Sequence, residues 1–453
     1  MPPTPGAPPQ RPLPRMAASE ADPWEANPFR RFFLFCALAT LFIRLSVLPE
    51  VIAYLTNVNT YLLYFVAPPA LVGVVLMGGI RRIFRSKASL LWMAFFAWMV
   101  IATPFSSWRG GSTQRVLDYA RVDLIFLLIA GGLVITWKDV KATFYTIAGA
   151  AVMNLMIANL FLDDSHGRLT LTASGTIGNS NDLAAHLLLV LPFLFFVAMG
   201  RRPLVVRIAV LGLMVYGLWI MLGTASRGAL VALFGVLVCV LVRASPPQRI
   251  MALLLTFLLA AASVAILPGR SAERLSALFG QSDKEADESA ASRWYLFKKS
   301  VQYTIQHPIF GVGPDQFGNY EGKASLAEGQ HGAWHATHCV LTQVSAECGI
   351  PALLFFAAAL GTAFRLVIRQ YLRARREGYA EIANACFCYL IAMVGYLSAL
   401  LFLANAYAFT LPMMIGLGIA LSFAAARQMR KAPAAAPAWR RAQAPMASAP
   451  LRA

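Results

Sequence analysis

Residues 183–200 read LAAHLLLVLPFLFFVAMG, an apolar run bounded by Asp182 before it and by Arg201 and Arg202 after it. A helix rises about 1.5 Å per residue, so a run of this length crosses most of the roughly 30 Å hydrocarbon core of a bilayer. The stretch is typical of a transmembrane helix.

Eleven further stretches have the same character, and the chain as a whole is correspondingly apolar. Hydrophobic residues make up 58% of the 453 residues and charged residues only 13%. A chain of this size and composition must be solvated by lipid. We therefore predict an all-α polytopic membrane protein with about 12 transmembrane helices, at residues 32–48, 59–79, 88–104, 120–137, 142–162, 183–200, 203–222, 228–243, 250–268, 349–368, 382–403 and 407–426.

Five segments follow from this pattern. Residues 1–31 and 427–453 are rich in Pro and Ala and hold no apolar run, so we expect two disordered tails without chemistry and no cleaved leader. Residues 32–268 hold nine spans, and residues 349–426 hold three. Between them, residues 269–348 form a long loop. Arg44 falls in the last turn of the first span, where we expect it to extend to the outer headgroups.

The basic residues predict the orientation, because positively charged loops stay in the cytoplasm. If both termini are inside, 26 of the 39 Lys and Arg residues lie on the inner side. The net charge of +18 is then a topology signal, and membrane lipids are the expected partners of these clusters, with no nucleic acid. The six cysteines are expected to be small core residues.

The loop 269–348 is the longest connector and faces outward in this orientation. It contains the amphipathic stretch SRWYLFKKSVQYTIQ (292–306), the turn HPIFGVGPDQF (307–317) and the stretch HCVLTQVSAEC (338–348). Long loops commonly carry function. We expect at least two helices lying on the outer face of the bundle.

Several arginines lie on the outer side despite the positive-inside tendency. A pyrophosphate held at the membrane surface would account for them, although each could also extend to a lipid phosphate or cap a helix. They are Arg109, Arg115, Arg121, Arg168, Arg227 and Arg293.

Arg227 is the sharpest case, because it sits in the short corner MLGTASRGAL (221–230) between two spans. Gly223 and Gly228 flank this corner and would allow a ligand to approach the backbone closely, after which the guanidinium could bind phosphate oxygens bidentately. Simple helix punctuation by the two glycines is the alternative.

His338 begins the predicted helix 338–348, with Thr342 and Ser345 on the same face. A neutral imidazole there could accept a proton from a sugar hydroxyl, although an isolated histidine is more often structural. His331, His335 and His338 share a spacing that a metal site would use, but Gly332 interrupts the helix that this needs. We expect neither a metal nor another cofactor.

Four segments together resemble the O-antigen ligase and polymerase superfamily of bacterial envelope glycosyltransferases. They are GTIGNSNDLAAHLLLVLP (175–192), GTASRGALVALFGVLV (223–238), ASRWYLFKKSVQYTIQHPIFGVGPDQF (291–317) and HCVLTQVSAECGIPALLFF (338–356). Two positions depart from the family pattern: Cys339 stands where an Asn commonly follows the histidine, and Leu341 replaces an aromatic residue.

The resemblance implies a fold related to GT-C-type glycosyltransferases in the bacterial inner membrane, with both termini in the cytoplasm and the active site facing the periplasm. It implies an O-antigen ligase that transfers polysaccharide from undecaprenyl pyrophosphate to lipid A-core oligosaccharide, by metal-independent inverting transfer, in lipopolysaccharide biosynthesis. Arg227 and Arg293 would neutralise the pyrophosphate and His338 would act as base. Asn181 and His335 are further candidates for substrate contact.

Three alternatives remain. An O-antigen polymerase would share the two arginines and the histidine and differ in its acceptor. A protein O-oligosaccharyltransferase is disfavoured because no sizeable soluble domain follows the last span. A transporter or flippase for lipid-linked glycans would need ionisable residues or broken helices inside the membrane, and the predicted spans hold few of either.

Overall fold

The computed structural model describes residues 25, 27–163, 168–172, 177, 179–266, 284–329 and 334–431. Its elements, in chain order, are α1 (Pro28–Leu45), α2 (Leu48–Thr56), α3 (Leu62–Leu76), α4 (Gly79–Ile83), α5 (Lys87–Ala102), η1 (Thr103–Phe105), α6 (Arg109–Asp118), η2 (Tyr119–Asp123), α7 (Ile125–Gly131), α8 (Trp137–Phe161), β1 (Leu162–Asp163), β2 (Thr170–Leu171), α9 (Ser180–Met199), α10 (Leu204–Gly223), α11 (Arg227–Arg243), α12 (Pro246–Ile266), α14 (Lys284–Gln306), α15 (Phe317–Ala327), α16 (Val340–Glu377), α17 (Ala380–Leu400) and α18 (Thr410–Lys431).

The protein is an all-α, polytopic membrane protein, as predicted, with one two-residue antiparallel hairpin, β1–β2, among the described residues. Seven helices are long and apolar enough to cross a membrane, α5 with η1, α8, α9, α10, α16, α17 and α18, and the bent pair α1–α2 makes an eighth. α3 and the Pro246–Leu259 part of α12 are apolar but shorter. The predicted number of about 12 is therefore not reached by this criterion within the described residues, although a helix lies at each predicted position.

Two predicted spans are broken, which corrects their bounds. The span 32–48 ends at Leu45 because Val47 is left-handed (φ 47°), and α2 then leaves at 62°. The span 120–137 is instead a helical run that starts at Arg109, passes through the π-turn η2 and ends at Gly131.

A buried carboxylate explains where that run stops. Asp139 accepts hydrogen bonds from the backbone N–H groups of Ile135 (3.1 Å) and Thr136 (2.9 Å), so α8 begins there with a capping box. Asp139 also pairs with Arg30 at 2.9 Å, which ties the start of α1 to the start of α8.

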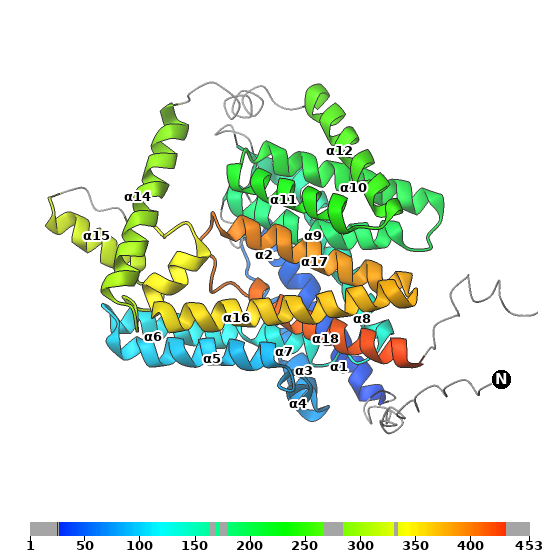
Figure 1. Ribbon diagram of the computed structural model, residues 1–453, viewed down its shortest axis with the longest axis horizontal. Coiled ribbons are helices and arrows are strands. Elements are labelled where there is room, and N and C mark those ends of the chain that lie inside the picture. Colours follow the sequence, from blue (N-terminus) through cyan, green and yellow to red (C-terminus); the bar gives the residue numbers. More distant parts are fainter. Residues whose placement is uncertain are drawn as a thin grey trace, which may run out of the picture.

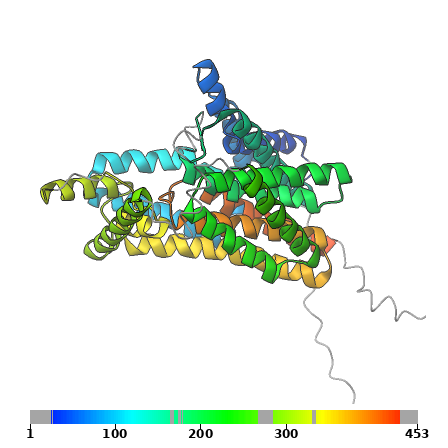
Figure 2. The same cartoon turned by 90° about the horizontal axis from the view of Figure 1, so that it is seen from above.

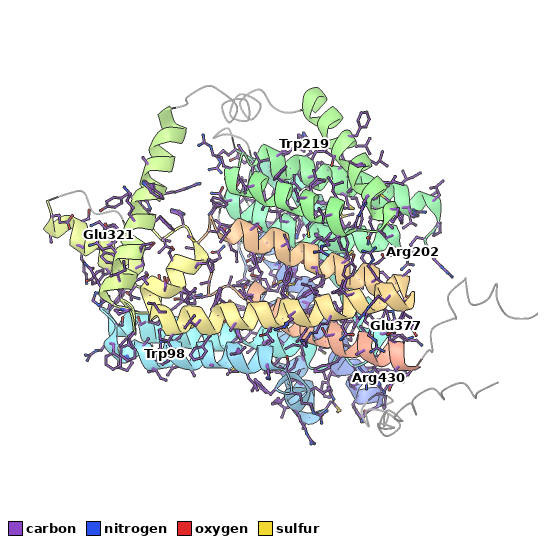
Figure 3. The ribbon with its side chains drawn as sticks, in the orientation of Figure 1. Trp98, Arg202, Trp219, Glu321, Glu377 and Arg430 are labelled. Carbon is purple, nitrogen blue, oxygen red and sulfur yellow. The ribbon has the colours of Figure 1, made fainter. Side chains whose placement is uncertain are left out.

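The bundle has two distinct ends. Glu25, just before α1, forms ion pairs with Arg427 and Lys431 at the end of α18, so the first and last described helices have these termini at the same end. Arg202 and Arg430, both predicted to be on the inner side, lie at this end in Figure 3. α14 and α15 of the long loop project from the opposite end (Figures 1 and 2).

The core is formed by α9, α17 and α18. In the most apolar stretch of these helices, 83%, 78% and 83% of the residues, respectively, are buried. α16 packs along α5 and α17, and α10, α11 and α12 form a layer against α9 and α17 (Figure 1). This arrangement brings the start of α11, the start of α16 and the connection 401–409 to the same end as α14.

The long loop is organised largely as predicted. The stretch 292–306 is the second half of α14, and 307–316 is a turn. The prediction that a helix starts at His338 is wrong: α16 starts at Val340, after a left-handed His338 (φ 54°). α16 then kinks at Gly349 (φ 84°), so the last loop helix and the following span are two parts of one broken helix.

Candidate functional site

Arg227 is the first residue of α11 and is exposed at the end of the bundle from which α14 projects. Its helix starts there because the Ser226 hydroxyl caps it, accepting from the Ala229 N–H at 3.4 Å. The preceding Ala225 is left-handed (φ 49°), a conformation that costs a residue with a Cβ about 1 kcal/mol or more. The corner therefore holds the guanidinium at a fixed place at the helix N-terminus.

The glycines around Arg227 have a packing role, which corrects the expectation that they admit a ligand. A Cβ on Gly223 would lie 2.2 Å from the Leu169 side chain, and one on Gly228 would lie 2.8 Å from that of Phe402. Arg168 donates to the Thr224 carbonyl (3.0 Å) and secures the same corner.

Arg293 lies on α14, which packs against the first part of α16 (Figure 1). Leu296 and Tyr303 form the buried face of α14, and Thr304 forms a hydroxyl–hydroxyl bond of 2.9 Å with Ser345. Arg293 is half-buried, and burial together with the charge of Arg227 lowers the pKa of its guanidinium. The two guanidinium groups are therefore near enough for their charges to repel each other.

His338 joins this pair. Burial, the charge of Arg293 and the neighbouring His335 together lower the pKa of its imidazole below the usual value. A lowered pKa keeps the ring neutral at physiological pH, the form that can accept a proton. The predicted shared face with Thr342 and Ser345 is wrong, since His338 precedes the helix and Ser345 turns to α14.

The Arg227–Arg293 pair has the properties of an anion site. Among the described residues, no carboxylate forms an ion pair with either guanidinium. Two guanidinium groups without acidic partners among the described residues, one exposed and one half-buried, favour a doubly charged oxyanion such as a pyrophosphate. A metal site of His, Cys, Asp and Glu is absent from the described part of the chain, and His331 lies outside it.

The turn 307–316 fixes α14 relative to α16. Val312 and Gly313 donate to the carbonyls of Ala346 (2.8 Å) and Glu347 (2.9 Å), and the N–H of Ile350 donates to the Pro308 carbonyl at 2.8 Å. These bonds cross the kink of α16. They therefore determine how Arg293 stands relative to His338.

Glycine is required on both sides of this contact. A Cβ on Gly311 would lie 2.3 Å from the backbone carbon of Glu347, and one on Gly349 would lie 2.0 Å from the Ile309 carbonyl oxygen. Both residues also have positive φ, 67° and 84°. Gly311 of the turn and Gly349 of α16 are thus explained by backbone packing.

Glu347 completes the contact and was not identified from the sequence as a functional residue. Its buried carboxylate accepts from the Asp315 N–H (3.0 Å) and from the Tyr407 hydroxyl (2.6 Å). One side chain of α16 thus joins the turn and the connection 401–409. A carboxylate inside an otherwise apolar helix was the available signal.

The remaining candidates lie in other surroundings. Arg109 and His335 are exposed, and Arg121 pairs with Asp118 on the surface of η2. Asn181 accepts from Arg168 at 2.9 Å, so it supports the Arg227 corner. Arg115 is grouped with carboxylates, 3.8 Å from Asp123.

A polar cavity of about 540 Å³ lies beside this group, between the end of α1, η2 and the starts of α9, α16 and α18. Arg44, Asp123 and His186, three ionisable residues of three predicted spans, line it. Arg44 therefore faces the cavity, with its guanidinium 4.6 Å from the ring of Phe409, and the prediction that it extends to the headgroups is not met. Ionisable residues within apolar runs were again the available signal, but only Arg44 was considered from the sequence.

Comparison with known proteins agrees with this architecture. Residues 212–357 match the family described as O-Antigen ligase, and this range contains Arg227, Arg293 and His338. The resemblance to the O-antigen ligase and polymerase superfamily is thereby confirmed. The match supports a ligase or polymerase type of role in O-antigen processing by a multi-pass membrane protein. No curated protein matches the chain.

Proposed function

Because this chain carries the domain of the O-antigen ligase and polymerase superfamily, we propose that it is an O-antigen ligase. In this proposal it transfers O-antigen polysaccharide from undecaprenyl pyrophosphate to lipid A-core oligosaccharide, at the periplasmic face of the bacterial inner membrane. The observation that carries the proposal is the cation pair Arg227–Arg293 beside His338. The pair offers a site for the pyrophosphate, and His338 offers a base for the acceptor.

The proposed reaction forms one bond and breaks one. A hydroxyl oxygen of the acceptor attacks the anomeric carbon of the first sugar of the donor, and the bond from that carbon to the pyrophosphate oxygen breaks. His338 takes the hydroxyl proton, and the carrier leaves as undecaprenyl pyrophosphate. Attack from the side opposite the leaving group inverts the anomeric centre.

The arginines act on the leaving group. Negative charge grows on the bridging oxygen as the bond breaks, and guanidinium groups already in place stabilise it without reorganisation. Pyrophosphate is a good leaving group, so this stabilisation needs no metal ion. Removing one such group typically lowers the rate about 100-fold to 1,000-fold.

Burial lowers the pKa of His338, and the positive charge of Arg293 lowers it further. The imidazole therefore remains neutral and able to accept a proton. When the pyrophosphate binds, its negative charge offsets that of Arg293 and raises the basicity of His338. Donor binding thereby prepares the base.

The experiment combines purified protein, carrier-linked glycan and lipid A-core in detergent. The wild type is expected to join glycan to lipid A-core, and His338→Ala is expected to form no product. Ser345→Ala is a matched control on the neighbouring part of α16, because its hydroxyl contacts Thr304 and lies off the reaction. Product that stays on the carrier and grows in length would instead show a polymerase, and movement of glycan across vesicles without transfer would show a transporter.

A further inference from the structure

The polar cavity beside Arg115 has a composition suited to a sugar. Its wall combines carboxylates, amides and hydroxyls, including Asp182, Gln343, Asn405 and Thr410, with the aromatic residues Tyr407 and Phe409. Carboxylates and amides accept and donate to sugar hydroxyls, and aromatic faces pack on the apolar faces of the ring. A volume of about 540 Å³ lies within the usual range for small-ligand sites.

Its charge differs in sign from that of the Arg227–Arg293 pair. Asp118, Asp123, Asp182 and Asp315 line the cavity, against the two guanidinium groups of Arg44 and Arg115. Arg115 lies 3.8 Å from Asp123, so part of its charge is already offset. A phosphate or carboxylate would therefore be repelled from the cavity and attracted to the cation pair.

Hydrogen-bonding groups in this cavity remain available. The Nε of Arg115 is buried and has no partner among the described residues. Asp315 is exposed to the cavity, and the protein around its carboxyl raises its pKa. A buried polar atom such as the Arg115 Nε requires a partner, which a sugar hydroxyl can supply.

The cavity reaches the first turn of α16, which follows the proposed base His338 in the chain. Gln343 lines it and lies five residues after His338, in the first turn of α16. Its side-chain oxygen accepts from the Ala406 N–H at 3.0 Å, so the connection 401–409 forms the wall on that side. Asn405 of the same connection donates to Asp182 at 2.9 Å. A saccharide held there would lie at the start of α16, the helix that follows His338 in the chain.

We propose that this cavity binds an uncharged sugar of the acceptor saccharide, next to the sugar whose hydroxyl is glycosylated. This inference rests on the proposed function. It adds a specificity: an acceptor sugar that carries a carboxylate or a phosphate at this position is rejected, because the four aspartates of the wall outnumber its two arginines.

The test measures acceptor and donor KM separately for Asn405→Ala. Loss of one hydrogen bond to a sugar hydroxyl is expected to raise the acceptor KM about threefold to tenfold, with kcat and donor KM unchanged. Asn384→Ala is the matched control. Its amide accepts from Gln248 at 3.0 Å near the start of α17, away from the cavity, and it should leave all three constants unchanged.

A second variant tests the cavity in case Asn405→Ala fails to fold. Ala404→Phe fills the cavity from its wall and is expected to abolish binding of free core oligosaccharide, measured by saturation-transfer NMR, while Asn384→Ala retains it. A charged analogue, in which the sugar next to the glycosylated one is oxidised to a uronic acid, should bind at least tenfold more weakly than the neutral one.

The outcomes separate this inference from the proposed function. An unchanged acceptor KM, or a raised donor KM alone, would overturn the cavity assignment while leaving the ligase reaction standing. If wild-type protein transferred no glycan, the ligase proposal would fail, but the NMR experiment would still test the cavity assignment. That assignment is rejected if Ala404→Phe binds the oligosaccharide as well as the wild type does, or if the uronic acid analogue binds as well as the neutral one.

Discussion

Replacing Gly349 by alanine tests whether the kink of α16 positions the catalytic groups. The added Cβ would lie 2.0 Å from the Ile309 carbonyl oxygen, and ordinary contact requires at least 3.4 Å, so the turn must move by more than 1 Å. Alanine would also have to adopt φ 84°, which costs about 1–2 kcal/mol.

The movement breaks contacts that cross the kink. The bond from Ile350 N–H to the Pro308 carbonyl (2.8 Å) is lost, and that from Gly313 N–H to Glu347 (2.9 Å) is weakened, each contributing about 1 kcal/mol. The total destabilisation is about 3 kcal/mol. Because the turn connects α14 to α16, Arg293 shifts relative to His338, and a misplacement of about 1 Å can lower the rate roughly 100-fold.

The assay compares Gly349→Ala with Gly361→Ala, which is the same substitution on the same helix. A Cβ on Gly361 meets nothing within 4 Å, so helix propensity should leave this control as stable as the wild type or up to about 1 kcal/mol more stable. Thermal unfolding in detergent and initial transfer rates are measured for both. If Gly349→Ala unfolded and transferred glycan like Gly361→Ala, the kink would have no positioning role.

Three further predictions concern the site. Arg227→Lys keeps the charge but loses the bidentate fork, so transfer should fall about 100-fold or more with unchanged thermal stability, because Arg227 is exposed; wild-type rates would argue against bidentate phosphate binding. Arg293→Gln removes the charge that lowers the pKa of His338, so NMR titration of labelled histidine should show the His338 pKa rising toward 6.5, and a fall or no change would contradict the assigned cause. Transfer should persist after exhaustive chelation, and its abolition with recovery on adding zinc would refute the metal-free reaction.

Hydropathy predicted the helical membrane fold because lipid requires long apolar helices, and each such helix is a continuous apolar run in the sequence. The breaks in the helices were harder to predict from the sequence. Val47 is a β-branched residue in a left-handed conformation, and nothing local marks it as the end of a helix. Gly349 was visible only as part of a motif, because its positive φ depends on the contact with Ile309 far earlier in the chain.

The functional site, like the fold, was predicted only in part. The arginines and the histidine were identified because charged groups on the outer side of a membrane protein are few, and the resemblance linked them. The cavity was missed because Arg44, Asp123 and His186 lie in different helices, and only tertiary packing brings them to one wall. Each alone had an adequate explanation as a single polar residue in a span.

The most direct test of pyrophosphate binding by Arg227 and Arg293 is a structure of the protein bound to undecaprenyl pyrophosphate, solved by electron cryo-microscopy in lipid. We expect phosphate oxygens about 2.7–2.9 Å from the guanidinium nitrogens of both arginines, with the first glycan carbon facing His338. A pyrophosphate bound instead among Arg44, Arg115 and the carboxylates of the cavity, or contacting neither Arg227 nor Arg293, would contradict this expectation.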